Sequence, residues 1–107
     1  MKSFNGKVAA ITGAASGMGR TLALQLAKEG CHVSISDVDT KGLAETVKMV
    51  KAAAPNVKVT SQQLDVSNRE AMYAWADQTA KDHGKVNLIF NNAGVAYATP
   101  VEHIDYD

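Results

Sequence analysis

The sequence predicts an α/β protein built on a doubly wound parallel sheet. Three observations predict this fold class: short apolar runs alternate with helical stretches along the 107 residues, the connections between them are only a few residues long, and a glycine-rich turn joins the first run to the first helical stretch. Parallel strands joined by right-handed helical crossovers are the expected outcome of this alternation. Because the apolar runs are typical of strands buried on both faces, we expect helices on both faces of the sheet.

The first two strands and the helix between them are each indicated by a simple pattern. Residues 8–11 are a continuous apolar run, which predicts a buried strand. Over residues 18–29 apolar side chains recur at helical spacing, and Gly30 then ends the predicted helix. A second strand is predicted over residues 32–36, with Asp37 at its end.

The following segments repeat the alternation. A helix is predicted over residues 40–53 and a third strand over residues 57–64. Residues 67–70 read Ser-Asn-Arg-Glu, a capping-box pattern that makes the serine the N-cap of a third helix, and Gly84 ends that helix. Residues 86–90 predict the fourth strand. About four strands and three helices are therefore expected, which is the N-terminal half of a doubly wound nucleotide-binding fold.

The composition is typical of a soluble globular domain, with 46% apolar and 21% charged residues. Eleven basic side chains balance eleven acidic ones, which argues against nucleic-acid or membrane partners. No apolar run approaches the ~20 residues that span a bilayer, and no signal peptide is recognised, so we expect a cytoplasmic protein. Cys31 is the only cysteine, and a buried thiol is expected. The three histidines lack metal-ligand spacing, so no metal site is predicted.

The glycine-rich turn at residues 13–19 predicts a binding site for a diphosphate. The first turn of a helix has unpaired N–H groups and a partial positive charge, and glycine lets a phosphate approach the backbone closely. Gly13 allows the tight turn out of the strand, Gly17 leaves room for the diphosphate, and Gly19 lets the helix pack against the sheet. Ser16 can add a hydroxyl donor. Because glycines also serve plain structural turns, the assignment depends on what surrounds this one.

A carboxylate at the end of the second strand favours the interpretation of the glycine turn as a binding site over that of a plain structural turn. Asp37 lies eighteen residues after Gly19, where it can accept both hydroxyls of an adenine ribose. The alternative is a turn residue or the N-cap of the next helix. NADP has a further phosphate on this ribose, which the carboxylate would repel, and Val38 and Asp39 follow without a basic neighbour. Arg20 is near the turn in sequence, but it lies inside the first helical turn and is expected to face solvent or a neighbouring helix rather than this phosphate. We therefore predict NAD as the cofactor, preferred over NADP by at least ~1.4 kcal/mol, a factor of ten.

Four motifs together resemble the signatures of the short-chain dehydrogenase/reductase family. They follow one another in the family's order and cover essentially the whole chain: Thr12-Gly13-x-x-x-Gly17-x-Gly19, Asp37, Leu64-Asp65-Val66 and Asn91-Asn92-Ala93-Gly94. The resemblance implies a Rossmann-type sheet, with residues 1–107 as an NAD-binding half-domain.

The resemblance also implies which residues bind the cofactor. The predicted cofactor-binding residues are Gly13, Ser16, Gly17, Met18, Gly19, Asp37, Val38, Asp65, Val66, Asn92, Ala93 and Gly94. The glycine turn, including Met18, would hold the pyrophosphate, and Asp65 would bond the adenine amino group with Val66 against the ring. Asn91 and Asn92 would brace the central strand and line the site, and the two residues after them would lie beside the ribose on the nicotinamide side.

The chemistry of the family depends on residues that this sequence lacks. The resemblance implies hydride transfer between NAD and a small alcohol or carbonyl substrate, with the tyrosine of a Tyr-x-x-x-Lys pair exchanging the proton. None of Tyr73, Tyr97 and Tyr106 has a lysine four residues later. We therefore name no catalytic residue, expect the 107 residues alone to be inactive, and expect them to end before the catalytic segment of a longer oxidoreductase. The alternative is a non-catalytic NAD-binding or regulatory module.

The predicted fourth strand has consequences for assembly. Without a further strand beside it, residues 86–90 would present an unpaired edge, so we expect a marginally stable homo-oligomer that NAD stabilises. Asn87 stands where the family usually has an acidic residue, and little effect on cofactor binding is expected. A third alternative, the extended branch that includes sugar epimerases, is disfavoured because that branch usually spaces its glycines as G-x-x-G-x-x-G.

Overall fold

The computed structural model describes residues 4–92 and contains seven elements in the predicted order. The strands are β1 (Val8–Thr12), β2 (His32–Asp37), β3 (Val59–Gln63) and β4 (Leu88–Asn91). The helices are α1 (Gly17–Lys28), α2 (Thr40–Ala53) and α3 (Arg69–His83). The predicted α/β class is confirmed. Within residues 4–92, none of the helices combines the length and the apolar character needed to span a bilayer.

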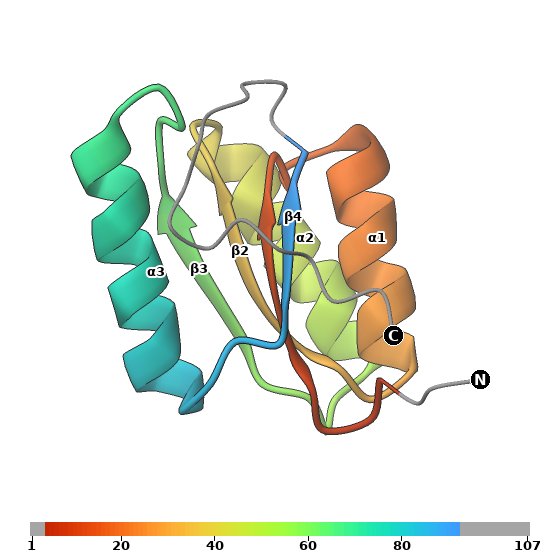
Figure 1. Cartoon of the computed structure of the whole chain (residues 1–107). Coiled ribbons are helices and arrows are strands. Elements are labelled where there is room, and N and C mark those ends of the chain that lie inside the picture. The colour runs from red at the N-terminus through yellow and green to blue at the C-terminus, as the bar shows by residue number, and fades with distance from the viewer. Residues whose placement is uncertain (1–3, 93–107) are drawn as a thin grey trace.

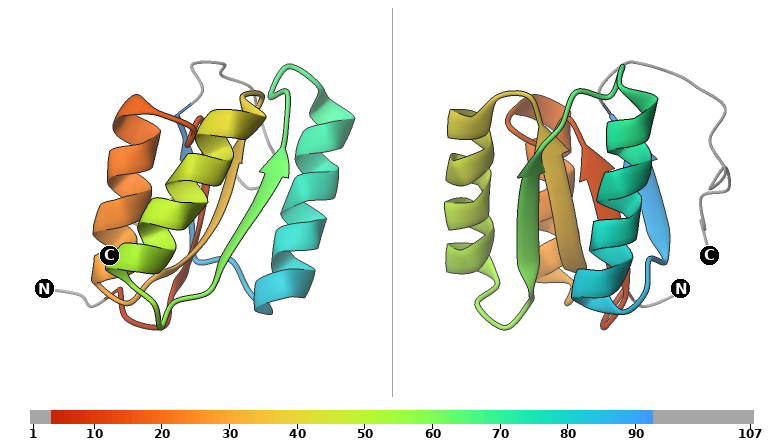
Figure 2. Two further views of the ribbon diagram at one scale, coloured as in Figure 1. Left: turned by 180° about the vertical axis from the view of Figure 1, so that it is seen from behind. Right: turned by 90° about the vertical axis from the view of Figure 1, so that its left-hand side faces the viewer.

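All four strands are parallel, and their order across the sheet is β3-β2-β1-β4. The chain moves outward from β1 to β3 through α1 and α2, and α3 then returns it past β1 to β4. Because crossovers between parallel strands are right-handed, this reversal of direction requires α3 to cross on the other side of the sheet. Accordingly, α1 and α2 cover one face of the sheet and α3 covers the opposite face (Figures 1 and 2).

The face that carries α1 and α2 is closed by apolar packing. Alternate residues of the two central strands, Ile11 and Ile35 among them, are fully buried there. They share one core with Ala23 of α1 and Leu43 of α2. Cys31 lies in the same core, and burial raises the pKa of its thiol to about 11, so the expectation of a buried thiol is confirmed.

The opposite face is covered by α3, and its core is smaller. The buried apolar residues of this core are Ala10, Leu64, Val66 and Trp75. The hydroxyls of Ser34 on β2 and Thr79 on α3 form a buried hydrogen bond of 2.7 Å between the sheet and the helix. This face is therefore held by polar as well as apolar contacts.

Two strands begin later than predicted, for identifiable reasons. The N–H of Val57 donates to the carbonyl of Ala54 at 3.1 Å, so the chain is still turning out of α2 at the predicted start of β3. Before β4, the N–H of Asn87 donates to the Val8 carbonyl at 2.9 Å, while Asn87 Oδ1 accepts from the Val8 N–H at 2.9 Å. One of the two hydrogen bonds to Val8 is thus made by the side chain of Asn87, and regular pairing of β4 with β1 begins at Leu88.

The N-cap of α3 is Asn68, so the prediction of a serine cap is wrong. The N–H and the hydroxyl of Ser67 both donate to Asp65 Oδ1, at 2.9 and 2.6 Å. The hydroxyl of Ser67 is therefore already engaged in a local turn, and Asn68 Oδ1 accepts from the N–H of Ala71 at 3.0 Å.

Candidate cofactor-binding site

The predicted site lies at the carboxyl ends of the strands, beside the central strand β1 (Figure 1). From β1 the chain crosses to β2 on one side, whereas β4, which comes last, pairs with β1 on the other side. Where the direction of connection reverses in a parallel sheet, the loops diverge and leave a crevice at the carboxyl edge. The turn after β1 and Asn92 after β4 border this crevice, with Asn92 Nδ2 3.5 Å from the carbonyl oxygen of Gly13.

The turn after β1 depends on glycine at two positions. Gly13 and Gly17 have φ angles of +66° and +58°, a region that residues with a Cβ rarely adopt. A Cβ added at Gly17 would meet no heavy atom within 4 Å, so the backbone at that residue opens to solvent. This geometry fits a turn that a large anionic group can approach.

Gly19 is required by close packing. A Cβ on Gly19 would lie 2.1 Å from the carbonyl oxygen of Gly13 and 2.9 Å from Asn92 Nδ2. The expected tight packing of this glycine is present, and its nearest neighbours are the turn itself and the residue after β4. Gly19 therefore lets α1, the turn and the end of β4 meet at one point.

The N-terminus of α1 differs from the N-termini of the other helices. Asp39 Oδ1 caps α2 by accepting from the N–H of Gly42 at 3.0 Å, and Asn68 caps α3 in the same way. Ser16 is the N-cap of α1, but its exposed side chain accepts no hydrogen bond from the helix, and the first turn contains no acidic residue. The first N–H groups of α1 therefore have no side-chain acceptor, and the helix dipole adds roughly half a positive charge there.

Asp37 ends β2 with both carboxylate oxygens bonded to backbone N–H groups. Oδ2 accepts from Ala15 in the glycine turn at 2.9 Å, and Oδ1 accepts from Asp39 at 3.0 Å. Since Asp39 is the N-cap of α2, the alternative that Asp37 caps this helix is wrong. Each oxygen of Asp37 keeps a further lone pair for a hydroxyl donor. Val38 follows, with 57% of its surface exposed.

A cavity of about 230 Å³ collects predicted residues from three separate segments. It is lined by Gly13, Asp37, Val38, Leu64, Asp65 and Val66. Hydrogen bonds from Ser67 lower the pKa of the Asp65 carboxyl, which keeps this exposed group ionised and able to accept from an amino group. The side chain of Val66 is buried in the core beneath α3 and forms an apolar wall of the cavity.

Thr12 connects the ends of β1 and β4, a role that the sequence motif did not reveal. Its hydroxyl donates to Asn91 Oδ1 at 3.0 Å and accepts from the N–H of Asn92 at 2.9 Å. These contacts fix both asparagines against β1, as expected of residues that brace the central strand. The hydroxyl at the last position of β1, directly before Gly13, was the available signal.

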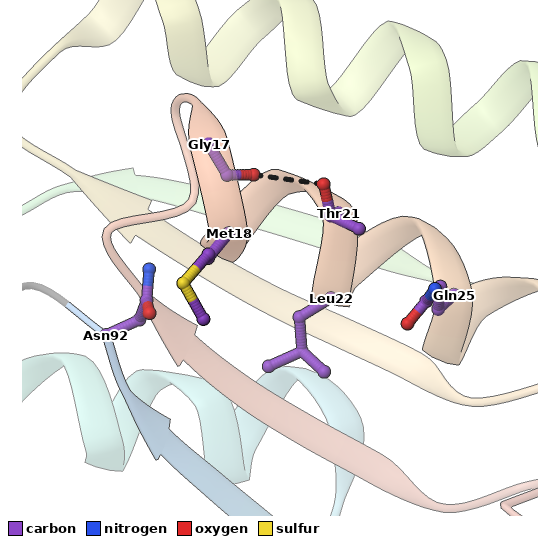
Figure 3. Close-up of a pocket in the computed structure, with 6 residues that line it drawn as sticks. All are labelled: Gly17, Met18, Thr21, Leu22, Gln25 and Asn92. Carbon is purple, nitrogen blue, oxygen red and sulfur yellow. Dashed lines mark hydrogen bonds between the residues drawn. The ribbon is translucent and has the colours of Figure 1, made fainter.

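A larger cavity, of about 500 Å³, runs along the first turns of α1. It is lined by Gly17, Met18, Thr21, Leu22, Gln25 and Asn92. Met18 and Leu22 project from the same side of α1, with Asn92 beside Met18, and Thr21 turns back to donate to the Gly17 carbonyl at 3.1 Å (Figure 3). Ala93 and Gly94, the last two predicted residues, lie outside the described residues.

The residues of the site fit a dinucleotide. Helix N–H groups without an acceptor suit a diphosphate, the carboxylate of Asp37 suits a ribose diol, and the cavity beside Asp65 suits a base that has an amino group. The structure places the predicted residues that it describes in the glycine turn and around the two cavities, and of these residues Ser16 and Gly19 belong to the turn and line neither cavity. Among residues 4–92, no group of three or more His, Cys, Asp or Glu side chains is placed to hold a metal ion.

Comparisons with known proteins agree with this geometry. Residues 7–107 match the model of the short chain dehydrogenase family. The chain is 48% identical to SadH of Mycobacterium tuberculosis, named as an oxidoreductase, over 106 residues that are 99% of this chain and 38% of that protein.

Two solved structures are similar as well. A short chain dehydrogenase/reductase from Burkholderia phymatum in complex with NAD matches with a TM-score of 0.82 and 46% identity, over 89% of this chain and 33% of that one. L-sorbose reductase from Gluconobacter frateurii, complexed with NADPH and L-sorbose, matches with a TM-score of 0.81 and 32% identity, over 96% of this chain and 39% of that one.

The chain thus spans less than two fifths of the length of each of these three relatives. The family match itself extends over nearly all of its residues and includes the glycine turn, the acid that ends β2 and the asparagines that end β4. The chain belongs to the short-chain dehydrogenase/reductase family.

Proposed function

We propose that residues 1–107 form the NAD-binding half of an oxidoreductase that interconverts small alcohols and carbonyl compounds. One observation carries the proposal: the only described helix whose N-terminus lacks a side-chain cap begins at a turn to which the carboxylate of Asp37 is hydrogen-bonded. Positive potential and a fixed acid therefore lie side by side, as a diphosphate and a ribose diol require. When bound, NAD supplies the hydride acceptor.

Each part of the site has a proposed role. The N–H groups at the start of α1, with Gly13 and Gly17, hold the diphosphate. Asp37 accepts the hydroxyls of the adenine ribose, and Asp65 accepts the adenine amino group at the cavity that Val38 and Val66 help to line. The remaining assigned residues line the turn and the nicotinamide end: Ser16, Met18, Gly19, Asn92, Ala93 and Gly94.

The choice of NAD over NADP rests on Asp37. One similar structure holds NAD and another holds NADPH, so membership of the family does not decide the cofactor. A phosphate on the adenine ribose would bring a second anionic group against the carboxylate of Asp37, whose oxygens are fixed by the N–H groups of Ala15 and Asp39. Repulsion of like charges then disfavours NADP.

Titration calorimetry of the chain with NAD and with NADP tests this proposal. The wild type is expected to bind NAD at least about ten-fold more tightly than NADP, and Asp37→Asn to lose most of this preference because the charge is removed at nearly constant shape. Asp77→Asn is the matched control, since Asp77 is exposed on α3, on the other face of the sheet. Equal affinity of the wild type for the two cofactors would show that the assignment of Asp37 is wrong.

The catalytic step of such an oxidoreductase requires residues other than those assigned to cofactor binding. Since the 107 residues contain no Tyr-x-x-x-Lys pair, we propose that they bind NAD without turning over substrate, and that a longer chain supplies the proton-exchanging tyrosine. Coding sequence after Asp107 that reads Ser and then Tyr-x-x-x-Lys would support the enzyme, and a stop codon would support a non-catalytic NAD-binding module.

The edge of the sheet at β4 is a second consequence. β4 pairs only with β1 among the described strands, so we also propose that the 107-residue chain self-associates through this edge.

A further inference from the structure

Arg20 stands where the helix dipole disfavours it. It lies in the first turn of α1, at the positive end of the dipole, where a cation costs a few tenths of a kcal/mol or more unless it has another partner. Its guanidinium turns to α2, where Nη2 donates to the Gly42 carbonyl at 3.0 Å and Nε donates to Thr46 Oγ1 at 2.8 Å. Nη2 also donates to the carbonyl of Ala15 in the glycine turn.

Thr46 completes the contact between α2 and the turn. Its side chain is fully buried, and its hydroxyl accepts from Arg20 while donating to the carbonyl of Ala14 at 2.7 Å. Gly42 allows this approach, because a Cβ on it would lie 2.7 Å from the Ala15 carbonyl oxygen. A glycine inside a helix costs about 1 kcal/mol, so close contact is a physical reason for its presence here.

The two side chains fix two successive peptide groups. In the Ala14–Ala15 peptide, the carbonyl accepts from Thr46 and the N–H donates to Asp37. In the next peptide, the carbonyl of Ala15 accepts from Arg20. Because a peptide group is planar and trans, its N–H points opposite to its carbonyl, so the N–H of Ser16 is turned away from the guanidinium. The direction of these groups therefore depends on Arg20 and Thr46.

We propose that Arg20 and Thr46 are positioning residues that orient the backbone of the glycine turn for the diphosphate. They form a clamp, defined as Arg20, Gly42 and Thr46, which holds the turn from the side of α2. The proposal rests on the proposed function, because it assumes that the turn receives a diphosphate. It goes beyond the proposed function because it makes two residues outside the assigned cofactor-binding set, Arg20 and Thr46, determinants of the cofactor's affinity.

The test compares a ligand that has a diphosphate with one that does not. Dissociation constants of ADP-ribose and adenosine are measured by NMR titration of the chain for the wild type, Arg20→Met, Arg20→Lys and Thr46→Val. Arg20→Met and Thr46→Val are expected to weaken the binding of ADP-ribose about ten-fold relative to the binding of adenosine, which is the scale of one charge-assisted hydrogen bond. Arg20→Lys is expected to lose less of the affinity for ADP-ribose. Lys28→Met, which removes an exposed cation at the other end of α1, is expected to leave the ratio unchanged.

A second measurement needs no ligand. Amide hydrogen exchange at Ala15 is expected to accelerate at least about ten-fold in Thr46→Val, because the Ala14–Ala15 peptide loses the hydrogen bond that orients its N–H toward Asp37. The exchange rate is expected to stay unchanged in Lys28→Met. If Arg20→Met does not fold, Thr46→Val and Arg20→Lys carry the test.

The outcomes separate the clamp from the proposed function. A wild type that binds ADP-ribose, with folded variants that keep its ratio to adenosine, would overturn the clamp alone. A wild type that binds no ADP-ribose would overturn the proposed function and, with it, the role of the clamp.

Discussion

Strand β2 presents a different chemistry to each face of the sheet. Val33 and Ile35 enter the apolar core beneath α1 and α2, whereas Ser34 and Ser36, which alternate with them along the strand, point to the opposite face, on the side of α3. Ser34 bonds to Thr79 of α3, while the buried hydroxyl of Ser36 has no hydrogen-bond partner among residues 4–92. One strand therefore contributes apolar packing on one side and hydrogen bonding on the other.

The difference extends to the helices themselves. On the α3 face the indole N–H of Trp75 is buried and has no acceptor within the described part of the chain. A cavity of about 280 Å³ lies beside this side chain, between α3 and the residues around β4. The α1 and α2 face has the larger apolar core and, at its carboxyl edge, the clamp on the glycine turn. The comparison indicates that the glycine turn is held against the face with the larger apolar core, so we expect substitutions in that core to cost more stability than substitutions on the α3 face.

Truncation of a side chain in the larger core is the severest test of this comparison. Ile35→Ala is expected to lower the free energy of unfolding by about 2–5 kcal/mol, because it removes buried apolar atoms and leaves a cavity at a fully buried position. Urea denaturation measures the change. Folded domains have a total free energy of unfolding of roughly 5–15 kcal/mol, so this substitution is expected to remove a large part of it. An effect smaller than that of the serine substitution on the same strand would refute the comparison.

That serine substitution gives the intermediate effect. Ser34→Ala leaves the buried hydroxyl of Thr79 unpaired, and we expect a loss of about 1–3 kcal/mol. Removing both partners in Ser34→Ala/Thr79→Val is expected to recover part of the loss, because no unpaired polar atom remains. A double-mutant cycle by urea denaturation measures the coupling. Strictly additive effects would mean that the hydrogen bond contributes nothing to the attachment of α3.

Local patterns predicted the fold, the glycine turn and the position of Asp37. These features depend on neighbouring residues and on spacings of a few turns, which a sequence displays directly. The polar face of β2 was visible as the alternation in His32–Asp37, but the expectation of strands apolar on both sides overlooked it. The serine cap failed because competition for one hydroxyl is decided by geometry: Asp65 already binds Ser67.

The clamp could not be predicted because it joins Arg20 to Thr46, twenty-six residues away, through the carbonyls of a turn. Two local irregularities pointed to it, namely a cation at the positive end of α1 and a glycine inside α2. A residue that breaks a local preference usually has a compensating partner elsewhere in the fold. In this chain both irregularities are explained by the same contact.

The α3 face also differs from the other face in a polar cluster at the amino ends of β2 and β3. The pH dependence of stability tests what this cluster contributes. His83 at the end of α3 contacts Thr60 on β3, with its Nε2 2.8 Å from the hydroxyl oxygen, and its ring centre lies 6.5 Å from that of His32. Burial lowers the pKa of His83, the charges of Lys58 and His32 lower it further, and only Asp82 acts in the opposite direction.

Because the pKa of His83 is lower in the folded chain than in the unfolded chain, the unfolded chain binds the proton more readily. The stabilisation is therefore complete above the unfolded value of about 6.5 and declines as the pH falls from there through the folded value. His83→Gln is expected to flatten this decline between about pH 7.5 and 5.5 in urea denaturation, and Asp77→Asn, at an exposed position on the same helix, is not. The effect is the smallest of the three, since His83 is only half-buried and water screens its charge. An unchanged slope in His83→Gln would place the acid sensitivity of the fold away from the α3 face.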